Sequence, residues 1–529
     1  LDGIWKAHVA AISFLLGTGA DRSDILVAWE VTTQTVTDPL DATVAGSPAS
    51  AVSEASGFLG IQSVTCELGP TCPNGIDRTA QPYSQCPLTD NNTQCFLKIN
   101  LAVGSGATGT AIYPTGDGIC GQVGCAAIGD VLGGVIISTS YQQPLPNPLA
   151  GGATIPGAWT DPVAPADQGG VQLQALIIIP AGAAPAAGWP TVVFGHGLTS
   201  SKSALVAIAP QIAGQLHMAS IAIDFVDHGS RAVRISDTGD CAGTTLDPSV
   251  KPLCFASIIS ADLGQTRDNF RQTVLDLQRV VKVTKYCGTH QCVSATASGG
   301  TDPTPSTFKV DPAHIVYAGQ SLGGIIGTTV SATSPSIVSA LLNVPAVGLV
   351  DVLEHTDTLA IRCSLVDALI DAGVLVGNKS TAASPLCADE AWQAQPGYQQ
   401  FSGIARWVLD PADGANFMSR LVTKKFFIQE VVGDEVVPNY ATDIMGALAG
   451  LTPGTADPAT SATPPPSAAV TTNVTASKWV RYPTLPAAGA FPGNTFAHAS
   501  LLRPANAIDG TLGTVRLQTD ALTFLGANH

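Results

Sequence analysis

The chain has 529 residues, only 12% of them charged, and a net charge of −16 at neutral pH. This acidic balance argues against nucleic acid or an anionic membrane surface as a partner, so we expect an uncharged or zwitterionic substrate. The mean hydropathy is +0.27, yet no uninterrupted apolar segment suits a membrane-spanning helix, because the best candidate, 171–188, contains Gln, Pro and Gly.

Residues 1–130 are predicted to form an N-terminal cysteine-rich, β-containing region. Residues 24–35 alternate in polarity, carry β-branched and aromatic side chains, and are predicted to form a strand. The stretch that follows is rich in Gly, Pro, Asn and Thr and contains six of the twelve cysteines. Structural support is the expected role of this region, with attachment or substrate access as alternatives.

Most cysteines lie close to another cysteine in sequence, which predicts disulfides rather than a metal site, because no pair has the CxxC spacing of zinc ligands. The predicted local pairs are Cys120 with Cys125, Cys241 with Cys254, Cys287 with Cys292, and Cys363 with Cys387. The pairing within the cluster of Cys66, Cys72, Cys86 and Cys95 stays open.

Disulfides require an oxidising compartment, so we expect a secreted or cell-surface protein, extracellular or periplasmic. The chain begins at Leu1 and contains no signal peptide, so it is expected to be a mature or trimmed form.

From residue 131 onward, predicted strands alternate with predicted helices. Strands are expected at 134–140, 171–180, 190–195, 219–225, 314–318, 339–350 and 425–432, and helices at 203–216 and 257–285. This alternation predicts an α/β fold with a mostly parallel sheet covered on both faces. Residues 453–477 are rich in Pro, Thr, Ala and Ser and are expected to be a surface loop.

The predicted strand at 314–318 runs into Gly-Gln-Ser-Leu-Gly, with Ser321 at the centre. A Gly-x-Ser-x-Gly turn between a strand and a helix is a nucleophile elbow, in which the flanking glycines avoid steric collisions. The helix N-terminus behind the serine offers backbone N–H groups to an oxyanion. Ser321 is therefore the predicted nucleophile.

A serine nucleophile needs a histidine base, and in this arrangement the base follows it in the chain. Three histidines follow Ser321. His529 is the last residue, His355 could line the pocket, and His498 lies in a short loop near the chain end, where the base is expected.

The orienting acid should lie just past a strand end. Asp434 follows the predicted strand 425–432 and is the preferred acid. Glu435 beside it and Asp351 after the preceding strand are the alternatives.

The oxyanion hole needs two backbone N–H donors. We assign these to Leu322, which follows the nucleophile, and to Leu198 in the Gly-His-Gly-Leu segment 195–198. His196 in this segment is expected to brace the loop. The segment 224–231 packs acids, a histidine and an arginine together and could suggest a metal site, but a pocket rim is the preferred interpretation.

The chain resembles the α/β-hydrolase superfamily, and within it the large extracellular bacterial virulence-factor lipases, some of which act on phospholipids or lysophospholipids. The segments that carry the resemblance are 195–198, 223–231, 266–278, 319–328, 406–413, 433–439 and 497–502. It covers about 131–529 and implies an α/β-hydrolase core at 131–350 and 410–529. It also implies Ser321 as nucleophile, Asp434 as acid, His498 as base, and no cofactor and no metal.

Residues 351–409 are an insertion at the point where such folds carry a cap. An apolar helix at 365–376 would suit a lid over an acyl pocket, and an ordinary buried helix is equally compatible with the pattern. The expected function is a secreted lipase or carboxylesterase that acts on apolar esters, lipid or polyester, with transient contact to a lipid interface. Polyester hydrolysis, phospholipase activity, acyl transfer and a non-catalytic binding role remain open.

Overall fold

The computed structural model describes residues 37–51, 60–63, 65–67, 96–100, 110–114, 127–243, 246, 248, 251–290, 292–293, 307–487, 492–506 and 509–529. The predicted strand 24–35, the predicted Cys120–Cys125 pair and the four-cysteine cluster lie outside the residues whose side chains are described.

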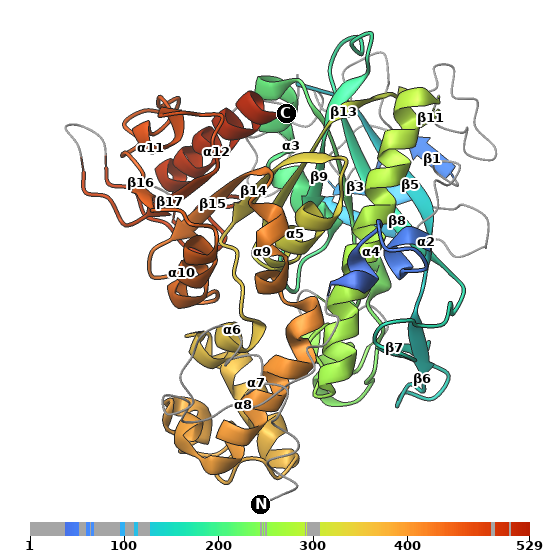
Figure 1. The fold of residues 1–529 in the computed structure, drawn as a ribbon, viewed down its shortest axis with the longest axis vertical. Coiled ribbons are helices and arrows are strands. Elements are labelled where there is room, and N and C mark those ends of the chain that lie inside the picture. The colour runs from blue at the N-terminus through green and yellow to red at the C-terminus, as the bar shows by residue number, and fades with distance from the viewer. Residues whose placement is uncertain are drawn as a thin grey trace, which may run out of the picture. The chain divides into compact units, whose positions relative to one another are not determined.

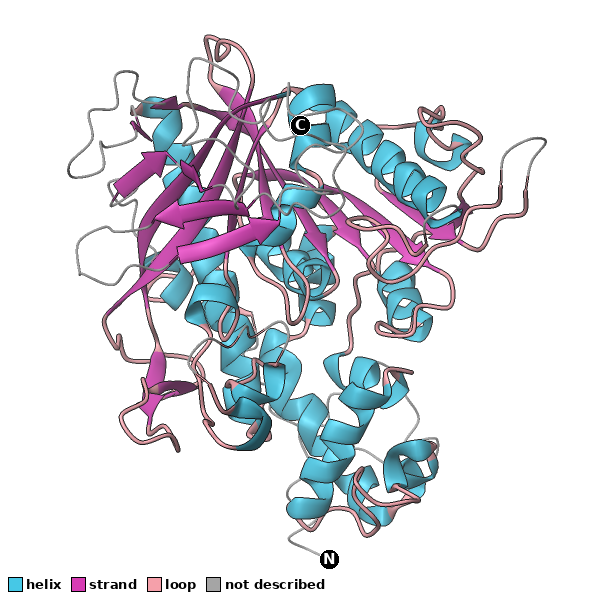
Figure 2. Cartoon of the chain, turned by 180° about the vertical axis from the view of Figure 1, so that it is seen from behind, coloured by secondary structure: helices cyan, strands magenta, loops and turns pink. Residues whose placement is uncertain are grey.

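A mostly parallel sheet forms the centre of the protein (Figures 1 and 2). Within the described residues it has ten strands, in the order β1-β5-β8-β10-β9-β13-β14-β15-β17-β16. Their bounds are β1 Gly60–Ser63, β5 Ile128–Thr139, β8 Gly170–Pro180, β10 Ala219–Ile223, β9 Trp189–Gly195, β13 Val310–Gln320, β14 Ile337–Asn343, β15 Lys425–Val431, β17 Lys478–Tyr482 and β16 Gly454–Thr455. Neighbours from β10 to β16 run parallel, whereas β1, β5 and β8 pair antiparallel.

Helices cover both faces of this sheet and close two hydrophobic cores. On one face, α4 (Leu263–Thr289) and α5 (Leu322–Thr333) bury Phe270, Leu277 and Ile325 against the strands. On the other face, α12 (Asp509–Asn528) buries Leu517 and Phe524. Interior strands contribute to both cores: Val193 of β9 lies in the first, and Phe194 in the second. This two-sided burial of parallel strands confirms the predicted α/β-hydrolase fold.

Smaller elements surround the main sheet. The antiparallel strands β2 (Thr65–Glu67), β3 (Phe96–Asn100) and β4 (Thr110–Pro114) lie in the N-terminal region that was predicted to contain β-structure. Two further pairs are β6 (Gln142–Leu145) with β7 (Ile155–Trp159), and β11 (Cys292–Val293) with β12 (Thr307–Phe308). No helix in the described part of the chain is long and apolar enough to cross a membrane.

Three sequence predictions were wrong in detail. The helix expected at 203–216 is divided into a 3₁₀ segment, Lys202–Ala207, the short α3, Ala209–Gln211, and a π turn, Ile212–Leu216. Pro210 lacks a backbone N–H and so interrupts the regular ladder. The strand expected at 339–350 ends at Asn343, because Val344 adopts a positive φ of 44°.

The third error concerns 453–477, which is more than a surface loop. It contributes the edge strand β16 and the short helix α11 (Ala468–Thr471), whose Val470 is fully buried. The strand β17 that follows it was not predicted, although it carries the sheet toward the chain end.

Of the helices between β14 and β15, three fall where an insertion at 351–409 was expected. They are α6 (Leu349–His355), α7 (Leu359–Asp371) and α8 (Pro396–Leu409), and they lie together at one end of the view in Figure 1. A small separate core, formed by α7, α8 and the chain between them, contains Val366, Trp392 and Tyr398, together with Cys387 of the Cys363–Cys387 disulfide. The predicted Cys241–Cys254 and Cys287–Cys292 disulfides are also present.

Removing the Cys363–Cys387 disulfide should destabilise this helical segment. The bond closes a loop over a sequence separation of 24 residues, and loop-closure entropy predicts a loss of about 3 kcal/mol. In the Cys363→Ser/Cys387→Ser variant, limited proteolysis should cut within 356–400 at lower temperature than in the wild type. The Cys287→Ser/Cys292→Ser variant, with a separation of 5 residues, is the control and should leave the cleavage temperature of this segment unchanged. Equal resistance of wild type and the first variant would contradict the expectation.

Candidate active site

The turn between β13 and α5 presents Ser321 in a strained conformation. Its φ is +58° and its ψ −121°, a region that residues with a Cβ rarely occupy. The turn is tight because a Cβ on Gly319 would overlap the carbonyl of Gly323, and one on Gly323 would overlap the carbonyl of Gly195. The two glycines that flank the serine are therefore required by packing, as a nucleophile elbow demands.

Ser321, His498 and Asp434 form one hydrogen-bonded chain. The Ser321 Oγ lies 2.7 Å from the His498 Nε2, and the His498 Nδ1 lies 2.7 Å and 2.9 Å from the two Asp434 carboxylate oxygens. A carboxylate only accepts hydrogen bonds, so Nδ1 carries the proton and Nε2 is free to accept from the serine hydroxyl. This is the geometry that general-base activation of a serine requires.

Each member of this chain follows the carboxyl end of a parallel strand. Ser321 comes directly after β13, Asp434 comes three residues after β15, and His498 lies in the loop between β17 and α12. The Asp434 side chain is almost fully buried, and its Oδ1 accepts backbone N–H groups from Val436 at 2.8 Å and Val437 at 3.0 Å. These bonds fix the carboxylate so that it faces the imidazole.

One positioning contact was not found from the sequence. The Gln320 side chain donates from its Nε2 to the His498 backbone carbonyl at 3.1 Å and so ties the histidine loop to the elbow. Residue 320 occupies the variable position of Gly-x-Ser-x-Gly, so the motif gave no signal for it.

The two predicted oxyanion donors come from segments that adjoin the serine. Leu322 is the first residue of α5, and Leu198 follows Gly197, where a Cβ would lie 3.4 Å from the Ser321 Cβ. Neither the Leu198 N–H nor the Leu322 N–H donates a hydrogen bond to another described residue. Both N–H groups are thus without an acceptor among the described residues, as an oxyanion donor must be.

Two buried histidines brace the loop that carries Leu198. The His196 Nε2 accepts the Phe225 N–H at 3.1 Å, and its Nδ1 donates to the Gly197 carbonyl at 2.8 Å. The His228 Nε2 accepts the Thr199 N–H at 3.2 Å. Burial lowers the pKa of His196 to about 3 and also lowers the pKa of His228, so both rings stay neutral and keep these acceptor roles. The bracing role expected for His196 is what its contacts provide.

The segment 224–231 lines a pocket, as expected. Asp227, His228 and Gly229 form part of the wall of a pocket that also reaches Leu198. Asp224 instead holds the loops together, because the Lys202 ammonium lies 2.5 Å from its Oδ2 and the Ser230 hydroxyl 2.7 Å from the same atom. Across the described ranges, no group of three His, Cys, Asp or Glu side chains is arranged to hold a metal ion.

The alternative triad residues lie elsewhere. Asp351 pairs with Arg406 at 2.9 Å, and Glu435 is exposed to solvent. His355 packs its ring against Tyr440, and the ring of His529 lies against that of His314.

Comparison with known proteins found solved structures of low similarity to this chain. No protein-family model and no curated protein matches the chain. An acetyl xylan esterase from Paenibacillus sp. R4 is 14% identical over 69% of this chain and 83% of its own, with a TM-score of 0.36. An acetyl xylan esterase from Thermoanaerobacterium sp. is 13% identical over 69% and 82%, with a TM-score of 0.31. The Pyrococcus furiosus esterase is 14% identical over 59% and 79%, with a TM-score of 0.30. These likenesses are too low to carry an argument about activity, and the fold assignment rests on the sheet itself.

The pH dependence of stability should report on Asp227. Burial raises the pKa of Asp227 to about 7 against the partial opposition of Arg231. The folded state therefore holds a proton that the unfolded state releases, so this contribution to stability is full below pH 4 and is lost as the pH rises through 7. Asparagine does not titrate, so Asp227→Asn should not lose this stability at high pH. Its free energy of unfolding should exceed that of the wild type by about 1–3 kcal/mol at pH 8 and differ little at pH 4. Urea unfolding at both pH values measures this, and a gain that is larger at pH 4 would refute it.

Proposed function

We propose that the protein is a serine hydrolase that cleaves carboxylic esters through an acyl-enzyme. The observation that carries the proposal is the continuous series of hydrogen bonds from the Ser321 hydroxyl through His498 to Asp434. The backbone N–H groups of Leu198 and Leu322 near it donate to no described residue. Activation of the nucleophile and stabilisation of the oxyanion are the two requirements of acyl transfer, and the candidate groups for both adjoin Ser321.

The mechanism follows from the positions of these groups. His498 accepts the Ser321 proton at Nε2 while the serine oxygen attacks the ester carbonyl. The carbonyl oxygen gains negative charge, which the N–H groups of Leu198 and Leu322 bind. Asp434 stabilises the imidazolium by accepting its Nδ1 proton in a hydrogen bond. His498 then protonates the leaving alcohol and activates the water that hydrolyses the acyl-enzyme.

Apolar carboxylic esters are the substrates we propose, so the activity is that of a lipase or carboxylesterase. The low charge content of the chain supports this. The helical segment α6–α8 is proposed to cap the substrate site. In the sequence it lies between β13, which leads to the proposed nucleophile, and β15, which leads to the proposed acid. Secretion is proposed from the disulfides.

Loss of the nucleophile tests the proposal most directly. The wild type should hydrolyse a p-nitrophenyl ester series from acetate to palmitate, and Ser321→Ala should lower kcat by about 10⁴-fold or more. A fluorophosphonate probe should label the wild type at Ser321 only. Hydrolysis that is unchanged in Ser321→Ala, or a protein that hydrolyses none of the esters and takes no label, would reject the enzymatic function and favour a binding role.

Substitution of two neighbouring carboxylates distinguishes the proposed acid, Asp434, from its alternative, Glu435. Asp434→Asn should lower kcat on the order of 10³–10⁴-fold. An amide at this position no longer keeps the His498 proton on Nδ1, so Nε2 is not held free to accept the proton of Ser321. Glu435→Gln changes the same functional group at the next, exposed position and should retain kcat within about twofold. If the two variants lose equal activity, Asp434 is not the orienting acid.

A further inference from the structure

The side chain of Gln320 lies between the loop that carries His498 and the candidate oxyanion loop, 195–199. Gln320 is the last residue of β13, and its side chain is only 5% exposed. Its Nε2 donates to the His498 backbone carbonyl at 3.1 Å. Its Oε1 adjoins Gly197, because a Cβ at position 197 would lie 2.7 Å from that oxygen. One carboxamide group therefore touches the loop of the proposed base and the loop of the proposed oxyanion donor.

The loop that carries His498 has few other ties at the histidine itself. Its ends are held by burial, since Phe496 is 9% exposed and Leu501 is fully buried. Between them, hydrogen bonds that join residues 497 and 500 close a turn inside the loop. Among the described residues, no group other than the Gln320 amide donates a hydrogen bond to the His498 backbone from outside this loop. The position of the imidazole therefore depends on Gln320.

The candidate oxyanion loop is held from its other side without Gln320. The His228 Nε2 accepts the Thr199 N–H at 3.2 Å. Leu198 and Thr199 also form the wall of a small pocket together with Phe255, which belongs to the segment before α4. This side of the loop is thus braced whatever residue occupies position 320.

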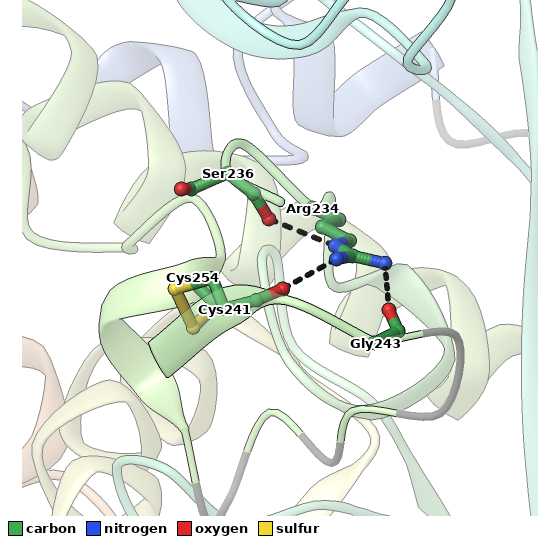
Figure 3. Close-up of a disulfide and its surroundings, with 5 residues drawn as sticks. All are labelled: Arg234, Ser236, Cys241, Gly243 and Cys254. Atoms are coloured by element: carbon green, nitrogen blue, oxygen red, sulfur yellow. Dashed lines mark hydrogen bonds between the residues drawn. A yellow bond between two sulfur atoms is a disulfide. The ribbon is translucent and has the colours of Figure 1, made fainter. Parts of the chain in front are cut away.

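The segment before α4 is itself firmly tied. Figure 3 shows the Cys241–Cys254 disulfide beside Arg234, whose guanidinium donates to the carbonyls of Ser236 at 2.8 Å, Gly243 at 2.7 Å and Cys241 at 2.5 Å. Because none of these contacts involves residue 320, a substitution there should leave the candidate oxyanion loop folded. Its effect should be confined to the position of that loop relative to the loop of the histidine.

The two loops must keep a fixed separation during acyl transfer. In the proposed mechanism, His498 takes the proton of Ser321 while negative charge forms beside the Leu198 N–H, so one transition state is in contact with both loops. A displacement of about 1 Å in either group can lower the rate by about 10²-fold. A side chain that links the loops therefore acts on the transition state more than on substrate binding.

We propose that Gln320 is a positioning residue that sets the separation between the proposed base and the proposed oxyanion donor. The inference rests on the proposed ester hydrolase activity and adds to it a residue that acts through the backbones of His498 and Gly197. Its Nε2 fixes the loop of the histidine, and its Oε1 fixes the distance to the candidate oxyanion loop. A side chain at position 197 would displace this amide, which accounts for the glycine there.

The variant Gln320→Met tests the contact with the histidine loop, because it keeps the length of the side chain and removes the donor. With p-nitrophenyl butyrate, kcat per fluorophosphonate-reactive site should fall by about 10–100-fold, and KM should stay within about threefold. The matched control is Gln518→Met. Gln518 is 8% exposed, and its Nε2 donates to the Leu501 carbonyl at 2.8 Å in the same loop. The two variants should lower Tm by a similar amount, but Gln518→Met should keep kcat within about twofold.

The variant Gly197→Ala tests the contact with the candidate oxyanion loop. The added methyl group should push the Gln320 amide aside and lower kcat by about tenfold. In the Gln320→Ala background the amide is absent, so Gly197→Ala should lower kcat by less than about threefold.

Three results would overturn the role of Gln320 while leaving the esterase proposal intact. They are an unchanged kcat in Gln320→Met, an equal loss of kcat in Gln320→Met and Gln518→Met, and an equal effect of Gly197→Ala in the two backgrounds. A wild type that neither hydrolyses the ester nor takes the fluorophosphonate label would overturn both proposals together.

Discussion

The strained backbone of Ser321 is the constraint around which the candidate site is arranged. A φ of +58° costs on the order of 1–3 kcal/mol for a residue with a Cβ, and the surrounding structure must supply that energy. The buried faces of β13 and α5 fix the two ends of the turn. Close backbone contacts at Gly319 and Gly323 restrict the conformation of the turn between them. The strain places the hydroxyl at the sheet edge, where the histidine loop can reach it.

The parts of this site that could be predicted from sequence are those with a local steric or chemical signature. The glycines around Ser321 reveal the elbow, and the order of serine, acid and base along the chain selects Asp434 and His498, which the structure places in contact. His196 was expected to brace its loop, but the other two braces could not be predicted. Gln320 and His228 act through single hydrogen bonds to backbone atoms that are distant in sequence, and such pairings depend on the folded loops rather than on residue type.

In the fold, too, elements with a local sequence pattern could be predicted and elements that depend on distant pairing could not. Strands β9, β10 and β15 were predicted because they are short, apolar runs bounded by turn residues, a pattern that buried parallel strands share. The strand β17 was missed because Lys478 and Arg481 interrupt its apolar residues, and only pairing with β15 reveals its place. The apolar run after β14 was extended too far, since burial continues past Asn343 while the backbone turns at Val344.

The loops at the carboxyl edge combine groups that stabilise the fold with one that does not. His196, His228 and Asp224 are buried with their hydrogen-bonding capacity used, and they hold the candidate oxyanion loop in place. Asp227 is buried in the same turn, but only its Oδ2 accepts a hydrogen bond from a described residue, the amide of Asn269 at 3.4 Å, and its backbone conformation is one that glycine would adopt at less cost. Stability alone would favour glycine or asparagine at this position.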